Sequence, residues 1–129
     1  MVTMEAEQTK AAPKVLVVDD DHAILRMLRL CLSTAGLRVT TADNGAAGLD
    51  RLGGDDIDVV VLDLQMPTMD GRSFYREMVA RGQTKPVVIV SAYGAEEARR
   101  QLGAAAAIPK PFDPDALIEM VLGLAKTAS

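Results

Sequence analysis

Several carboxylates, one hydroxyl and one amine follow short apolar runs in this sequence, and together they could carry out phosphoryl transfer. Clustered carboxylates repel one another, which costs stability unless a cation joins them. Mg²⁺ accepts one or two carboxylates while it keeps waters and phosphate oxygens as further ligands. The residues that suggest this chemistry are Asp19, Asp20, Asp21, Asp63, Ser91 and Lys110.

The remaining groups complement such a metal site. Lys110 supplies a compact positive charge and Ser91 a hydroxyl donor, both suited to phosphoryl oxygens, and phosphoryl transfer needs mainly positioning and charge neutralisation. A carboxylate can serve as the nucleophile. Asp63 is difficult to explain structurally, because an ionised group within the apolar run VVVLDL is costly unless it is paired or metal-bound. A single aspartate after a strand is commonly a helix cap. A functional site is therefore favoured only by the aspartates, Ser91 and Lys110 taken together, at the ends of successive predicted strands.

Five strand patterns alternate with five helix patterns along the chain. The predicted strands cover about 15–18, 37–41, 57–62, 87–90 and 106–108, and the predicted helices cover about 23–35, 46–52, 72–80, 95–102 and 114–125. Continuous apolar strands are typical of a parallel sheet that is buried between two helix layers. We therefore predict an α/β fold with a doubly wound, five-stranded parallel sheet, whose functional groups lie at the carboxyl ends of the strands.

Composition narrows the class of protein. The 129 residues are the length of one domain, with a flexible tail predicted at 1–12 and the folded domain at 13–129. A net charge of −4 argues against direct nucleic-acid binding. No apolar run approaches the roughly 20 residues of a membrane span, and the N-terminus does not resemble a secretory signal. With a single cysteine, these features predict a cytoplasmic protein.

Four motifs carry a family resemblance. VLVVDDD, DVVVLDLQMPTMDG, VIVSAYG and IPKPF resemble, in order and spacing, the motifs of the receiver domains of two-component response regulators, of the chemotaxis-regulator type. The resemblance covers about residues 14–125. It implies a flavodoxin-like (βα)5 fold with strand order 2-1-3-4-5.

The resemblance also implies a role for each matching residue. Asp63 matches the aspartate that accepts the phosphoryl group in this family. The implied Mg²⁺ ligands are Asp20, Asp63, the backbone carbonyl of Gln65 and, through water, Asp19. The side chain of Gln65 lies where the family tunes dephosphorylation.

Ser91 matches the family's switch hydroxyl and Lys110 its phosphate-binding lysine, with a cis peptide bond expected between Lys110 and Pro111. The implied donor is a phosphohistidine on a sensor histidine kinase or a histidine phosphotransfer protein. The chain is then not an enzyme in the usual sense, because its chemistry is its own phosphorylation and dephosphorylation. The resemblance leaves the downstream protein partner unidentified.

Two departures from the family pattern concern the transmission of the signal. The family's switch aromatic is replaced by Ala107, so nothing large can move inward behind Ser91 from that position; Tyr93 is a candidate substitute. The 19 positions from Ser91 to Lys110 are fewer than in the common pattern, so the helix at 95–102 loses nearly one turn. We expect an altered output face.

Three other functions are alternatives to this interpretation. For a receiver fold that binds partners without phosphorylation, Ala107 and the short helix are evidence in favour, whereas the intact acidic pair, acceptor aspartate, serine and lysine are evidence against. A phosphatase of the haloacid-dehalogenase type would use Asp19 and Asp21, but it leaves Asp63 unexplained and lacks a late acidic motif. A flavodoxin-like cofactor carrier would need a Ser/Thr/Gly-rich loop after the first strand. His22 is interpreted as a first-turn helix residue beside the site, in preference to a metal ligand or phosphohistidine.

Overall fold

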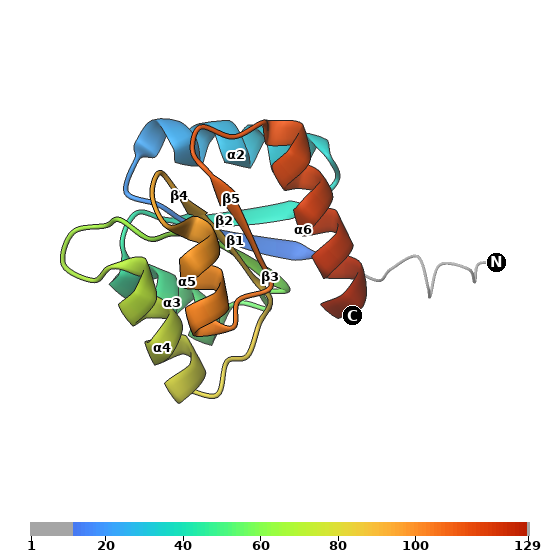
Figure 1. The fold of residues 1–129 in the computed structure, drawn as a ribbon. Helices are drawn as coiled ribbons and strands as arrows, with labels where there is room; N and C mark the ends of the chain where they lie inside the picture. Colours follow the sequence, from blue (N-terminus) through green and yellow to red (C-terminus); the bar gives the residue numbers. More distant parts are fainter. Residues whose placement is uncertain (1–11, 129) are drawn as a thin grey trace.

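The computed structural model describes the backbone of residues 12–128 and the side chains of residues 12–126, so nearly all of the predicted tail lies outside the described residues. Strands and helices alternate throughout this part (Figure 1). The strands are β1 (Lys14–Val18), β2 (Arg38–Ala42), β3 (Val59–Asp63), β4 (Val87–Ser91) and β5 (Ala106–Pro109). The helices are α2 (His22–Thr34), α3 (Gly45–Gly54), α4 (Gly71–Ala80), α5 (Ala95–Leu102) and α6 (Pro114–Ala128).

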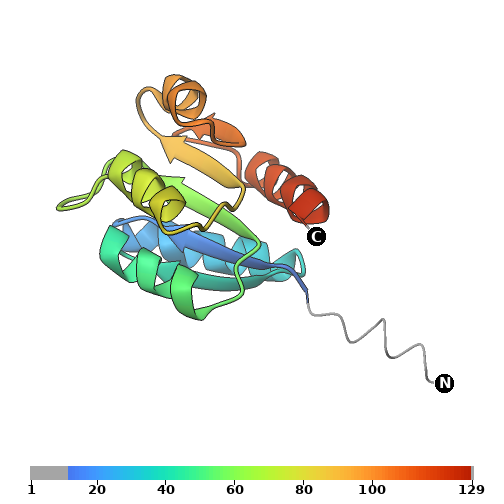
Figure 2. The ribbon, with the colours of Figure 1, turned by 90° about the horizontal axis from the view of Figure 1, so that it is seen from below.

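The five strands form one parallel sheet in the order β2-β1-β3-β4-β5, which confirms the predicted fold class and strand order. Helices α3, α4 and α5 cover one face, while α2 and α6 cover the other (Figures 1 and 2). The chain therefore changes faces between α2 and α3, and again between α5 and α6. No helix among residues 12–128 is both long and apolar enough to cross a bilayer.

The continuous apolar runs are explained by this two-sided burial. Successive side chains of a strand point to opposite faces, so each strand contributes to two cores. In β1, Val15 and Val17 pack with α2 and α6, whereas Leu16 and Val18 pack with α3, α4 and α5. All four side chains are fully buried. A strand of this kind has no polar face, which is why alternation is absent from its sequence.

Local signals set most helix boundaries. The side chains of Asp21, Asn44 and Asp70 accept backbone N–H groups at the starts of α2, α3 and α4, as N-cap residues do. Gly36 adopts a φ of 95° just after α2, as expected from its position at the end of the predicted helix. The predicted helix at 46–52 is longer in the structure, because α3 continues through two glycines to Gly54.

Candidate functional site

The strand register places the predicted site residues along one edge of the sheet. Val18 of β1 pairs with Leu62 of β3, so the residue that follows each of them, Asp19 or Asp63, emerges at the same level. The same alignment carries over to β4, where Val90 pairs with Asp63, and this places Ser91 next to that edge. The chain adds β2 on one side of β1 and then β3 on the other side. In parallel sheets such a change in strand order leaves a crevice between the two central strands, here β1 and β3.

Asp63 is the last residue of β3 and is only 3% exposed. Burial and the charge of Asp19 raise the pKa of Asp63 to about 6, although Lys110 and the backbone N–H of Gln65 act in the opposite direction. That N–H group donates to Oδ1 of Asp63 at 3.3 Å. A raised pKa of this kind is common among functional carboxylates, which makes Asp63 a candidate for the reactive group.

Lys110 supplies the opposing charge. Its Nζ lies 3.1 Å from Oδ2 of Asp19 and 3.5 Å from Oδ1 of Asp63, so it bridges both buried carboxylates. Burial by itself would lower the pKa of Lys110, but the hydrogen bond and charge of Asp19, with the charge of Asp63, outweigh it and raise that pKa. The peptide bond between Lys110 and Pro111 is cis, as predicted.

The three consecutive aspartates have separate positions. Asp19 is 3% exposed and belongs to the site, while Asp20 is exposed at its rim. Asp21 caps α2 by accepting the N–H groups of Ala23 and Ile24, at 2.9 and 3.4 Å. The backbone N–H of Asp21 donates to Oδ1 of Asp19 at 2.9 Å, which fixes the direction of that side chain.

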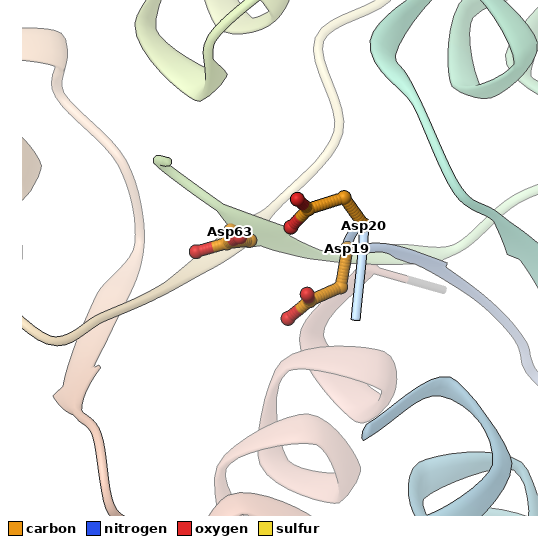
Figure 3. A group of neighbouring side chains, drawn as sticks. All are labelled: Asp19, Asp20 and Asp63. Carbon is orange, nitrogen blue, oxygen red and sulfur yellow. The ribbon is translucent and has the colours of Figure 1, made fainter. Parts of the chain in front are cut away.

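Three carboxylates converge in a way that fits a hard divalent cation. Oxygens from Asp19, Asp20 and Asp63 lie within 4.8 Å of one another, and Figure 3 shows the side chains next to each other at the ends of β1 and β3. Opposite ligands of an octahedral Mg²⁺ are separated by about 4.2 Å, so the spacing of the oxygens is compatible with that ion. An all-oxygen donor set favours Mg²⁺ over softer metals. Gln65 is exposed beside this cluster, on the loop that follows Asp63.

Ser91 is completely buried, and its hydroxyl is engaged by the loop that follows β4. The hydroxyl donates to the carbonyl of Tyr93 at 2.9 Å and accepts the N–H of the same residue at 3.3 Å. The side chain of Tyr93 is 77% exposed. Ser91 therefore lies at the site edge without a hydrogen bond to Asp63, while Ala107 packs half-buried in β5 against the core beneath α5.

The loop after Asp63 contains two features that sequence reasoning missed. A Cβ atom on Gly71 would overlap the backbone oxygen of Asp63 and lie 2.7 Å from Cα of Leu64, so only glycine allows α4 to start here. The N–H of Gly71 also donates to the carbonyl of Leu64 at 2.8 Å. Thr68 has a φ of 71°, which is rare for a β-branched residue. The Asp70-Gly71 dipeptide was the available signal for the first feature; nothing in the sequence indicated the second.

His22 opens α2, as predicted, and lies outside the acidic cluster. Its Nε2 is 3.1 Å from Oδ2 of Asp43, and both side chains are largely exposed. The hydrogen bond from His22 is the main reason why the pKa of Asp43 is lowered.

The fold and the site together define a doubly wound α/β protein with an acidic, lysine-containing centre at the switch between β1 and β3. Residues 15–122 match the family model described as the response regulator receiver domain. The chain belongs to this family.

Known proteins agree with that assignment. The chain is 37% identical over 110 residues to the transcriptional regulatory protein GlrR of Escherichia coli K12, covering 83% of this chain and 25% of GlrR. It is 39% identical over 110 residues to the DNA-binding transcriptional regulator NtrC of the same organism, covering 83% of this chain and 24% of NtrC. The chain thus spans about a quarter of the length of these curated relatives.

The same fold occurs in solved structures. The receiver domain of the Francisella response regulator 1452 superposes with a TM-score of 0.85 at 32% sequence identity, over 91% of this chain and 99% of that one. The likeness extends over the whole sheet and its helices, and not only over the acidic motifs.

Proposed function

We propose that this chain is a phosphorylation switch in which Asp63 accepts a phosphoryl group from a phosphohistidine. The donor would be a sensor histidine kinase or a histidine phosphotransfer protein. The observation that carries the proposal is the contact of Lys110 with two buried carboxylates, one of which has its pKa raised to about 6. Such a site suits a phosphoryl group, whose negative charge would be offset by Lys110 on one side and by a metal ion on the other.

In the proposed reaction, an oxygen of the Asp63 carboxylate bonds to phosphorus while the bond from phosphorus to the donor's imidazole nitrogen breaks. The imidazole leaves with the electron pair of that bond and takes up a proton. Lys110 offsets charge on a phosphoryl oxygen from its place 3.5 Å from Asp63. Asp20, Asp63, the carbonyl of Gln65 and, through water, Asp19 would hold Mg²⁺. When bound, Mg²⁺ would neutralise further charge on the phosphoryl oxygens.

Ser91 would transmit the change. A phosphoryl group on Asp63 offers new acceptor oxygens to the Ser91 hydroxyl, which now donates to Tyr93. If the hydroxyl turns toward the phosphoryl group, the loop at Tyr93 loses that contact and can rearrange. The phosphoryl group would bias two existing arrangements of this loop, as in other switches of this type.

We propose that the chain does not turn over an external phosphate ester. A phosphatase that used Asp19 and Asp21 would need both carboxylates free, whereas Asp21 caps α2. The chemistry would be confined to phosphorylation of Asp63 and its hydrolysis. The names of GlrR and NtrC concern whole proteins of which this chain matches about a quarter, so we carry over the receiver function alone. A cytoplasmic location would follow from the kinase partner.

The test is incubation of the chain with Mg²⁺ and acetyl phosphate, followed by mass spectrometry of the intact protein. We expect an acid-stable, base-labile phosphoryl group on the wild type and on Asp50→Asn, a control that changes an exposed aspartate of α3. We expect none on Asp63→Asn. A label retained by Asp63→Asn would place the acceptor elsewhere. A wild type that stays unlabelled, with partner binding that ignores Asp63→Asn, would instead support a phosphorylation-independent interaction module.

A further inference from the structure

A second charged cavity, with a lining that includes none of Asp19, Asp20, Asp63 and Lys110, lies at the carboxyl end of the edge strand β2. It has a volume of about 390 Å³ and is bounded by α2, by the end of β2 and by α3, from Ala47 in its first turn to Arg51 in its last. Arg26 and Arg29 of α2 and Arg51 of α3 line it. The two helices cover opposite faces of the sheet (Figure 1). A cavity lined by both helices and by the end of β2 therefore lies at the edge of the sheet.

The three guanidinium groups lack acidic partners in the part of the chain that the structure describes. The ion pairs found there involve other residues, and no carboxylate lies within 4.0 Å of Arg26, Arg29 or Arg51. Asp43 also lines the cavity, and its Oδ2 lies 3.1 Å from Nε2 of His22 and contacts none of the three arginines. This concentration of positive charge occurs in a chain whose net charge is −4.

Arg26 and Arg29 lie close together on α2, and their like charges are unfavourable unless an anion is bound. Arg26 and Arg29 are three residues apart, so they are neighbours on the helix surface and repel each other. The residues four positions on either side of Arg26 are His22 and Leu30, neither of which is acidic. An anion between the two helices would remove this repulsion.

One of the arginines is held in place by the sheet. Arg29 donates to the hydroxyl of Thr41 at 3.0 Å and to the carbonyl of Val39 at 3.4 Å. Both acceptors are neutral, so the guanidinium keeps its full charge. Its position is set before any ligand arrives, which lowers the entropic cost of binding.

We propose that this cavity, the arginine cavity, binds a small anion that carries two or more phosphate groups. Guanidinium groups bind phosphate oxygens in pairs of parallel hydrogen bonds, and three of them can serve several phosphate oxygens at once. Besides His22 and Asp43, the remaining lining is aliphatic or small, as at Leu25 and Ala42, and it contains no Phe, Tyr or Trp ring on which a base could stack. The ligand is therefore recognised by its phosphates. This site does not depend on phosphorylation of Asp63.

The experiment titrates the full chain with sodium tripolyphosphate by calorimetry, without Mg²⁺, at a salt concentration of about 0.15 M, at which long-range attraction is largely screened. We expect saturable binding of one anion per chain. The double variant Arg26→Gln/Arg51→Gln should bind about tenfold more weakly or worse, since each lost charge-assisted hydrogen bond contributes substantially. Arg29 is left unchanged because it also contacts β2.

The matched control is Arg76→Gln/Arg100→Gln, which removes the same number of charges from exposed positions on α4 and α5. It should bind as the wild type does, and so should Asp63→Asn. In ¹H–¹⁵N spectra, tripolyphosphate should shift the backbone amides around Thr41 and Arg51, and not those of Ser91 and Lys110.

The proposal is overturned if binding does not saturate, if the two double variants lose affinity equally, or if the shifts concentrate at Lys110. Equal affinity for sulfate would show a general anion effect and would also overturn it. Tighter binding of an oligo-aspartate peptide would assign the cavity to an acidic protein segment instead of a phosphate. None of these results bears on whether Asp63 is phosphorylated.

Discussion

The ammonium nitrogen of Lys110 lies 3.1 Å from Oδ2 of Asp19, although 91 positions separate the two residues in the chain. The contact joins the segment after β5, an edge strand of the sheet, to the loop after β1, which is an inner strand. The strands between them bring Asp63 into the same group, with its Oδ1 3.5 Å from the same nitrogen. The site is thus assembled by sheet order, which brings one ammonium group against two buried carboxylates.

The raised pKa of Asp63 predicts a specific dependence of stability on pH. In Mg²⁺-free buffer the folded protein binds the Asp63 proton more tightly than the unfolded chain does, so between about pH 4 and pH 6 the free energy of unfolding should fall as pH rises. Asp63→Asn has no such proton, so it should be more stable than the wild type at pH 7. The difference should shrink as pH falls toward 4. Urea unfolding of both proteins at several pH values measures it, and a constant difference would contradict the electrostatic account.

Mg²⁺ should raise the melting temperature of the wild type, because a ligand that binds only the folded state stabilises it. Asp20→Asn removes a carboxylate from the cluster and should abolish most of this rise. Asp21→Asn is the matched control: it removes a charge next door, and asparagine still caps a helix. Thermal unfolding with Mg²⁺ and with a chelator compares the three proteins. An equal loss in both variants would mean that net charge, and not the cluster, determines the response.

Gly71→Ala should destabilise the protein by about 1–3 kcal/mol, the usual cost of overpacking, because the new methyl group would meet backbone atoms that cannot move aside. The strain falls on Asp63 and Leu64, so phosphorylation by acetyl phosphate should slow as well. Gly53→Ala, in an open part of α3, should be neutral or stabilising by up to about 1 kcal/mol. Denaturant unfolding of the two variants provides the comparison. Equal changes in the free energy of unfolding would show that the contact of residue 71 with the backbone of Asp63 and Leu64 does not require glycine.

Thr68→Asn should stabilise the protein by about 0.5–1 kcal/mol, since asparagine tolerates the left-handed conformation that costs other residues about 1–2 kcal/mol. Thr68→Val keeps the β-branch and should show no gain. Chemical denaturation again provides the measurement. If Thr68→Asn is no more stable than Thr68→Val, the strain at φ 71° is absorbed elsewhere in the loop.

The sequence by itself determined the element order and the chemistry of the sheet edge. Runs such as Val59 to Leu62 can be satisfied only by burial on both faces, which predicts a parallel sheet between helices. Each reactive residue follows such a run directly, so its place at a strand end is a local property. Strand limits were close to the prediction, and α5 matched it at both ends, because glycines in the left-handed conformation flank that helix.

Only the tertiary structure decided which of several neighbouring residues belong to the site and which have a structural role. Asp19 and Asp21 are equivalent in the sequence pattern, but the backbone turns after β1 so that Asp19 faces Lys110 while Asp21 caps α2. The hydrogen bond from the Ser91 hydroxyl to the carbonyl of Tyr93 also depends on the geometry of the loop, which the sequence pattern does not predict. The arginine cavity depends on two helices from opposite faces meeting around β2. Hydrophobic periodicity acts over a few residues, whereas these contacts depend on strand order, register and loop direction, which exist only in the folded chain.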